Sequence, residues 1–199
     1  MKTVAVICEY NPFHNGHARQ LRQMAAVGTT VCVMSGNYVQ RGEPAICDKW
    51  TRARAAALCG ADLVLELPVT YALRSAEGFA DGGVEVLERL GCVDALCFGS
   101  ETGSAERVLS TARLLLSDAF SAALRQELAT GVSFPRAREL AVRRLSGEET
   151  PPLSAPNDIL AVEYCKAQLR RGSAIEPMLI RRDGDYHVGT DPNAPSASF

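Results

Sequence analysis

Short apolar segments alternate with helical segments along much of this 199-residue chain, and this alternation restricts the possible folds more than any other feature. The apolar segments are rich in β-branched residues and almost continuously hydrophobic, as strands are when helices cover both faces of a parallel sheet. The pattern therefore predicts an α/β fold with a five-stranded, parallel, doubly wound sheet of the Rossmann-like type. The expected strands cover residues 3–8, 29–34, 62–67, 94–98 and 175–180.

Helix-capping residues mark where the intervening helices begin and end. Asp48 is a suitable N-cap, and Gly60 and Gly91 are placed to end two helices. From about residue 101 to 146, helical stretches follow one another with no strand between them, which predicts a helical insertion beside the sheet. The expected helices cover residues 16–26, 48–59, 75–90, 105–116, 118–129, 135–145 and 157–171.

Composition restricts the classes of protein to consider. The 21 Lys and Arg nearly balance the 23 Asp and Glu, so the chain lacks the basic excess that is typical of a nucleic-acid binder. No apolar run approaches the roughly 18 residues of a membrane span, and no signal peptide precedes the first strand. We therefore expect a soluble, cytoplasmic protein.

The cysteines lack paired C-x-x-C spacing, and most of them lie in apolar runs. Reduced thiols in the core explain this distribution better than a disulfide framework or a zinc site does. The seven cysteines are Cys8, Cys32, Cys47, Cys59, Cys92, Cys97 and Cys165.

The segment EYNPFHNGH, residues 9–17, directly follows the first predicted strand. Ligands of open parallel sheets bind at the carboxyl ends of strands, where helix N-termini attract phosphate groups. Gly16 leaves room for a phosphate near the backbone. His14 and His17 lie three residues apart, so both rings can reach one anion. The segment thus indicates a phosphate-binding loop.

Two other interpretations apply to these histidines. His14 can cap a turn while His17 packs on the helix. Alternatively the pair can bind a metal ion, although two metal ligands on one helix face are more often four residues apart and no third ligand is obvious nearby. The combination of both histidines with Gly16 at this position favours phosphate.

The HNGH segment, residues 14–17, resembles the HxGH signature of the nucleotidylyltransferase (HUP-type) superfamily, whose members bind ATP over the sheet. Further segments narrow the resemblance: MSGNYVQRGEPAICDKWTRA, GADLVLELP, SAEGFADGGV, FGSE and PNDILAVEY. Together with EYNPFHNGH and in this order, they resemble the tRNA(Met) cytidine acetate ligase family from about residue 4 to residue 188. The resemblance implies that residues 1–199 form a nucleotidylyltransferase-like catalytic domain.

The resemblance also implies a two-step reaction. Acetate attacks the α-phosphate of ATP to give acetyl-adenylate and pyrophosphate, and N4 of the wobble cytidine in elongator tRNA(Met) then takes the acetyl group. Such a displacement needs positioning and charge neutralisation rather than a covalent protein nucleophile. His14 and His17 are therefore the expected catalytic residues, and Mg²⁺ is expected to bridge phosphate oxygens without a protein ligand that can be named.

Several residues outside the HNGH segment are expected to contact ATP. Gly99 ends a strand and Asn157 opens a helix, so each also has a purely structural explanation. Either Arg181 or Arg182 is expected to reach the phosphates. The predicted ATP-binding residues are Ile7, Cys8, Glu9, Tyr10, Asn11, Pro12, Phe13, His14, Asn15, Gly16, His17, Gly99, Asn157 and Arg182.

A polar segment with two glycines follows the second strand and is expected to line the same crevice. Gln40, Arg41, Lys49 and Arg52 are candidates there for contacts with phosphate, acetate or RNA, and a structural role is equally open for each. The arginine pairs at residues 143–144 and 170–171 are read as solvated helix ends.

The chain stops at PSASF, whereas ligases of this family continue into a further helical region that helps bind tRNA. We therefore expect the main tRNA-binding region to lie outside this chain, and weak or no tRNA binding by these 199 residues alone. Two alternative functions remain: a small-molecule adenylyltransferase of the same superfamily, and a non-catalytic nucleotide- or RNA-binding module.

Overall fold

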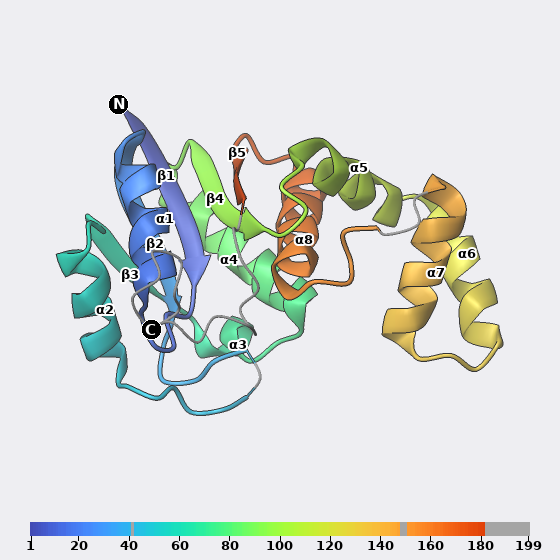
Figure 1. Ribbon diagram of the computed structural model, residues 1–199, viewed down its shortest axis with the longest axis horizontal. Coiled ribbons are helices and arrows are strands. Elements are labelled where there is room, and N and C mark those ends of the chain that lie inside the picture. Colours follow the sequence, from blue (N-terminus) through green and yellow to red (C-terminus); the bar gives the residue numbers. More distant parts are fainter. Residues whose placement is uncertain (41, 148–150, 182–199) are drawn as a thin grey trace.

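The computed structural model describes residues 1–40, 42–147 and 151–181, and its strands form one five-stranded sheet (Figure 1). All neighbouring strands are parallel, in the order β3-β2-β1-β4-β5. This confirms the predicted fold class. The strands are β1 (Lys2–Cys8), β2 (Gly28–Ser35), β3 (Leu63–Leu67), β4 (Ala95–Ser100) and β5 (Glu176–Arg181).

The expected helices all form, and every expected strand and helix lies within two residues of its predicted bounds. The sequence reading missed one further helix, α3 (Val69–Ala72), which has four residues and is too short to show a helical period. The remaining helices are α1 (Asn15–Ala25), α2 (Lys49–Leu58), α4 (Ala76–Leu90), α5 (Ala105–Leu115), α6 (Asp118–Ala129), α7 (Phe134–Ser146) and α8 (Pro156–Arg171).

Helices cover both faces of the sheet, which explains why the strands are almost continuously apolar. On one face, Leu21 and Met24 of α1 and Ala56 of α2 pack against side chains of β1 and β2. On the other face, Phe79 of α4 and Val162 of α8 belong to the larger of the two apolar clusters. The two clusters together bury the central strands.

Strand β1 lies at the centre of the sheet, with β2 on one side and β4 on the other. The strand order reverses between β1 and β4, and ligands of open α/β sheets bind at such a switch point. Helix α4 packs closely beneath this strand: a Cβ added to Gly83 would lie 2.5 Å from Cδ1 of Ile7. The strand that leads to the HNGH segment is therefore firmly held.

Helices α5, α6 and α7 follow one another between β4 and α8, and α6 and α7 form a hairpin that projects to one side of the sheet (Figure 1). An ion pair joins helix α7 of the hairpin to α8, which packs on the sheet. Arg138 of α7 bonds the buried carboxylate of Glu163 on α8 at 2.5 Å, and Lys166 pairs with the same carboxylate at 2.6 Å. A buried ion pair of this kind fixes geometry more than it adds stability.

The cysteines are all free thiols, and Cys8, Cys32, Cys97 and Cys165 are buried. Burial raises the pKa of Cys97 and of Cys165 to about 12, so both remain protonated and unreactive at neutral pH. None of the helices within the described part of the chain is long and apolar enough to span a bilayer.

Candidate functional site

The HNGH segment begins helix α1 at the carboxyl end of β1. His14 is the N-cap of the helix, and its Nδ1 accepts the backbone N–H of Gly16 at 3.1 Å. In return, Nδ1 of His17 accepts the backbone N–H of His14 at 3.3 Å. The two histidines thus form a reciprocal capping box, in which each side chain satisfies a backbone donor of the first turn.

The capping box determines which ring nitrogens can face a ligand. Because both Nδ1 atoms accept hydrogen bonds, the neutral imidazoles carry their protons on Nε2. The rings of His14 and His17 stack, with centroids 3.6 Å apart and planes inclined by 27°. The two stacked rings therefore lie side by side at the positive end of α1. The capping and phosphate-binding interpretations are compatible, since they use different nitrogens.

The aromatic rings of Tyr10 and Phe13 pack against His17 of the histidine pair. The ring of Tyr10 is only 1% exposed and lies 4.7 Å from that of His17 and 4.9 Å from that of Phe13. Tyr10 has a φ of 50°, an unusual backbone conformation for a bulky residue and one that often marks a functional turn. The next peptide bond but one, Asn11-Pro12, is cis.

Three of the predicted ATP-binding residues point into the core. Ile7 and Cys8 are buried in β1, and the hydroxyl of Tyr10 lies 3.5 Å from the sulfur of Cys32. Burial raises the pKa of the Tyr10 hydroxyl, which keeps it protonated. Of these residues, only backbone atoms remain available to a nucleotide.

Arg52 has a structural role, which decides between the two interpretations of this residue. Its side chain is only 2% exposed, and its guanidinium donates to the carbonyl oxygens of Glu9, Ser35, Gly36 and Cys47. These carbonyls belong to the loops that follow β1 and β2. Arg52 therefore clamps the two loops together instead of facing a ligand.

The segment between β2 and α2 is bonded directly to the loop before the histidines. The backbone N–H of Gln40 donates to Oε1 of Glu9 at 2.6 Å, and that of Ile46 donates to Oδ1 of Asn11 at 2.7 Å. The side-chain Nε2 of Gln40 is buried but has no hydrogen-bond partner among the described residues. A buried amide donor left in this state costs about 1–3 kcal/mol unless a ligand or water accepts from it.

Lys49 and Arg41 complete the set of candidates predicted in this segment. Lys49 forms an ion pair with Glu66 at 2.6 Å and lies 5.5 Å from the centre of the Trp50 ring. Arg41 falls outside the described residues.

The N-terminus of α8 faces the same edge of the sheet. Its first residues are hydrogen-bonded to a carboxylate of the protein itself. Oε1 of Glu101 accepts from Nδ2 of Asn157 at 2.6 Å, and Oε2 accepts from the backbone N–H of Asp158 at 2.9 Å. Asp158 is buried and accepts from the hydroxyl of Ser100 at 2.5 Å. Sequence reasoning missed Glu101 and Asp158, although both stand in the quoted segments FGSE and PNDILAVEY.

The remaining predicted residues that the structure describes lie at the same edge. Gly99 is paired with Ile180 near the carboxyl end of β4. Arg181 ends β5, is exposed, and lies against Gly103. Arg182 falls outside the described residues. The structure thus gathers the HNGH segment, Gly99, Asn157 and Arg181 around the ends of β1, β4 and β5.

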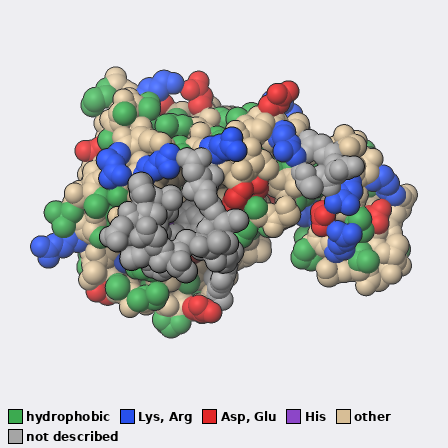
Figure 2. Space-filling model, in the orientation of Figure 1, with side chains coloured by type: hydrophobic (Ala, Val, Ile, Leu, Met, Phe, Trp, Pro, Cys, Tyr) green, Lys and Arg blue, Asp and Glu red, His purple; other side chains and the backbone are tan. Residues whose placement is uncertain are grey.

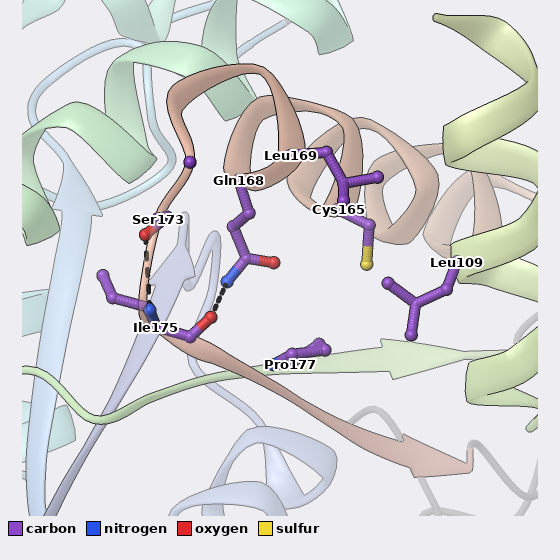
Figure 3. Close-up of a pocket in the computed structure, with 8 residues that line it drawn as sticks. Leu109, Cys165, Gln168, Leu169, Ser173, Ile175 and Pro177 are labelled. Carbon is purple, nitrogen blue, oxygen red and sulfur yellow. Dashed lines mark hydrogen bonds between the residues drawn. The ribbon is translucent and has the colours of Figure 1, made fainter.

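A pocket of about 180 Å³ lies elsewhere, between α5, the end of α8 and the start of β5 (Figure 3). Its amide group, on Gln168, already donates to the carbonyl of Ile175 at 2.8 Å. The pocket includes Ile175 and Pro177 at the start of β5, so it lies at the opposite end of this strand from the histidine site. Its lining residues are Leu109, Cys165, Gln168, Leu169, Gly172, Ser173, Ile175 and Pro177.

A parallel sheet of order 3-2-1-4-5, with a histidine-capped helix after its central strand, defines a nucleotide-binding domain of the nucleotidyltransferase class. The chain belongs to the HIGH nucleotidyl transferase family, whose model matches residues 1–199.

Relatives with curated names confirm the narrower resemblance found in the sequence. The tRNA(Met) cytidine acetate ligase of Caldicellulosiruptor saccharolyticus is 47% identical and covers 100% of this chain, which in turn covers 50% of that protein. The ligase of Acetivibrio thermocellus is 43% identical, over 94% of this chain and 48% of its own length. The chain therefore spans about half the length of the curated relatives it matches.

Solved structures agree with this assignment. Thermotoga maritima TmcAL bound with alpha-thio ATP superposes with a TM-score of 0.86 at 43% identity, over 92% of this chain and 47% of that one. The apo form of the same protein gives a TM-score of 0.88 at 42% identity, over 96% of this chain and 48% of that one.

Proposed function

We propose that this chain binds ATP, activates acetate as acetyl-adenylate, and serves in acetyl transfer to N4 of the wobble cytidine of elongator tRNA(Met). The observation that carries the proposal is the stacked pair His14 and His17, which caps the N-terminus of α1 at the switch point of the sheet. The similarity to tRNA(Met) cytidine acetate ligases supports the choice of substrates.

In the proposed first step, a carboxylate oxygen of acetate attacks the α-phosphorus of ATP. A new O–P bond forms, the bond to the bridging oxygen of the β-phosphate breaks, and pyrophosphate leaves. Hydrogen bonds from His14 and His17 stabilise the charge on the phosphates in the transition state, and the dipole of α1 adds to this effect. In the second step N4 of cytidine attacks the acetyl carbon, loses a proton and releases AMP.

The cap that Glu101 places on the N-terminus of α8 supports an orientation in which the phosphates of ATP lie at α1 instead. Because Glu101 already caps α8, phosphates are favoured at α1, and the adenosine is left to the ends of β4 and β5. Gly99, Asn157 and either Arg181 or Arg182 are the proposed contacts there. The residues that begin α1 are proposed to hold the phosphates.

Mg²⁺ belongs to the proposal only as the companion of the ATP phosphates. The described residues contain no group of three His, Cys, Asp or Glu side chains that could hold a metal ion. Mg²⁺ often keeps several waters and is held largely by substrate phosphates, a mode that this donor set allows.

Acetate-dependent exchange of labelled pyrophosphate into ATP tests the proposal. We expect exchange with acetate and little with larger carboxylates. Exchange that requires a phosphorylated metabolite and ignores acetate would instead establish a small-molecule adenylyltransferase. Binding of ATP with no exchange under any condition would leave only a nucleotide-binding module.

The side-chain amide of Gln40, whose Nε2 has no hydrogen-bond partner within the described part of the chain, is the proposed contact for the acetate carboxylate. Replacement by methionine keeps the length of the side chain but removes the donor. A hydrogen bond to a charged group contributes about 1.5–3 kcal/mol, so we expect the KM for acetate to rise roughly 10-fold or more while the KM for ATP changes little. The matched control is Gln126→Met, on the distant hairpin. An unchanged acetate KM in Gln40→Met would rule out this contact.

A further inference from the structure

Three exposed apolar side chains lie in the segment that follows β2, which is hydrogen-bonded to the proposed catalytic loop. Ile46 and Trp50 are 72% and 75% exposed, and Tyr38 is 46% exposed. We call these three residues the aromatic shelf. Figure 2 shows hydrophobic side chains gathered along the lower margin of the molecule, where Figure 1 places the loop between β2 and α2.

The shelf is held by hydrogen bonds rather than carried on a loose loop. The backbone of Ile46 is bonded to the side chain of Asn11, two residues before Phe13. Arg52, two residues after Trp50, is bonded to the carbonyl of Glu9. The shelf therefore keeps a fixed relation to the residues that lead into the histidine pair.

The carboxyl edge of the sheet is divided between two sides. The predicted adenosine contacts Gly99 and Asn157 belong to β4 and α8, on one side of β1. The shelf belongs to the connection between β2 and α2, on the other side. His14 and His17 lie between them, so a group on the shelf would approach the activated acetyl group from the side opposite the adenosine.

We propose that the aromatic shelf binds the acceptor nucleobase of a single-stranded RNA loop by stacking, with Trp50 as the main platform. Stacking of a base on an aromatic side chain strengthens binding by about 5- to 150-fold. Lys49 lies 5.5 Å from the centre of the Trp50 ring, and Arg54 is exposed in the next turn of α2. The exposed guanidinium of Arg54 suits a phosphate that flanks such a base, whereas the ammonium of Lys49 is already paired with Glu66. This inference rests on the proposed function, because it assigns the acceptor side of the same site.

The size of the shelf favours a base over a protein partner. A stable protein interface buries roughly 1,200–2,000 Å² in total, which three side chains do not provide. One or two stacked bases need only one or two aromatic rings. An RNA loop also presents its bases already unpaired, so no duplex has to be opened.

The single tryptophan of the chain gives a direct test, since Trp50 alone reports stacking through its emission. The probe is an RNA anticodon stem-loop with cytidine at the wobble position, titrated into the wild-type chain up to about 1 mM, the affinity expected from roughly 4 kcal/mol of stacking and phosphate contacts. We expect saturable quenching of Trp50 emission, and at least several-fold less quenching with an abasic wobble position. Absence of quenching over the whole titration, or equal quenching by the abasic RNA, would overturn the inference.

Variants separate the shelf from ATP activation. Trp50→Ala is expected to raise the stem-loop concentration needed for half-maximal binding about 10-fold, as one lost stack implies, and Trp50→Phe to recover most of the loss. Leu58→Ala is the matched control, because Leu58 is 77% exposed at the other end of the same helix. Acetate-dependent pyrophosphate exchange should be unchanged in all three variants.

The two proposals can fail separately. If Trp50→Ala lowers exchange as much as RNA binding, the shelf belongs to the ATP site and the inference is wrong. If the wild-type chain shows no pyrophosphate exchange but the stem-loop still quenches Trp50 emission, the proposed reaction is wrong. The inference that Trp50 stacks on RNA is then still supported.

Discussion

Replacing His14 by asparagine is expected to lower pyrophosphate exchange by about 10²–10³-fold with little loss of stability. Asparagine is a good N-cap, so it can accept the N–H of Gly16 as Nδ1 of His14 does. It has no group in the position of Nε2, however, and the loss of one charge-stabilising donor in a transition state has an effect of this size. Exchange kinetics and thermal unfolding of the same preparation measure the two quantities.

His14→Ala provides the comparison, because it removes the cap as well as the donor. We expect the same loss of exchange, together with a decrease of about 1 kcal/mol in the free energy of unfolding. If His14→Asn kept most of the exchange activity, His14 would be a structural cap only, and the interpretation of the histidine pair as a phosphate site would be wrong.

Replacing Arg52 by methionine is expected to lower the free energy of unfolding by about 4 kcal/mol. The substitution leaves the carbonyls of Glu9, Ser35, Gly36 and Cys47 without this donor, and each of the two buried ones, Ser35 and Gly36, costs about 1–3 kcal/mol when unsatisfied. For a chain of this size, that corresponds to a decrease in Tm of roughly 10 °C. Thermal unfolding followed by circular dichroism measures it.

Arg54→Met is the control for Arg52, because Arg54 lies on the same helix with an exposed side chain. A surface change of this kind is expected to stay within about 0.5 kcal/mol. Equal Tm values for the two variants would mean that the carbonyl clamp does not stabilise the two loops. Arg52→Lys should be nearly as destabilising as Arg52→Met, since lysine lacks the planar fork that reaches several carbonyls at once.

The strands and long helices were predictable because each buries a continuous or periodic apolar set, which a single sequence displays directly. The predicted ends of β1 and α6 illustrate how closely that pattern follows the structure. The position of the histidine pair was also predictable, because a parallel sheet delivers the segment after β1 to its carboxyl edge.

Other features depend on contacts between residues far apart in the chain. Nothing local in the sequence indicates that the charged side chain of Arg52 is buried among carbonyls that come from two separate loops. The cap that Glu101 provides for α8 joins residues 56 and 57 positions apart, so it became visible only once the fold placed β4 beside α8. The reciprocal histidine cap is local, but histidine is not among the usual N-cap residues.

The carboxylate at the start of α8 has a consequence for how a nucleotide enters the site. Among the helices that begin at this edge of the sheet, α1 starts with the histidine pair while the start of α8 holds Glu101. A polyanionic triphosphate is attracted by the first and repelled by the second. The carboxyl edge of the sheet is thus electrically polarised, and if ATP binds as proposed, we expect charge to select its direction before the base makes any contact.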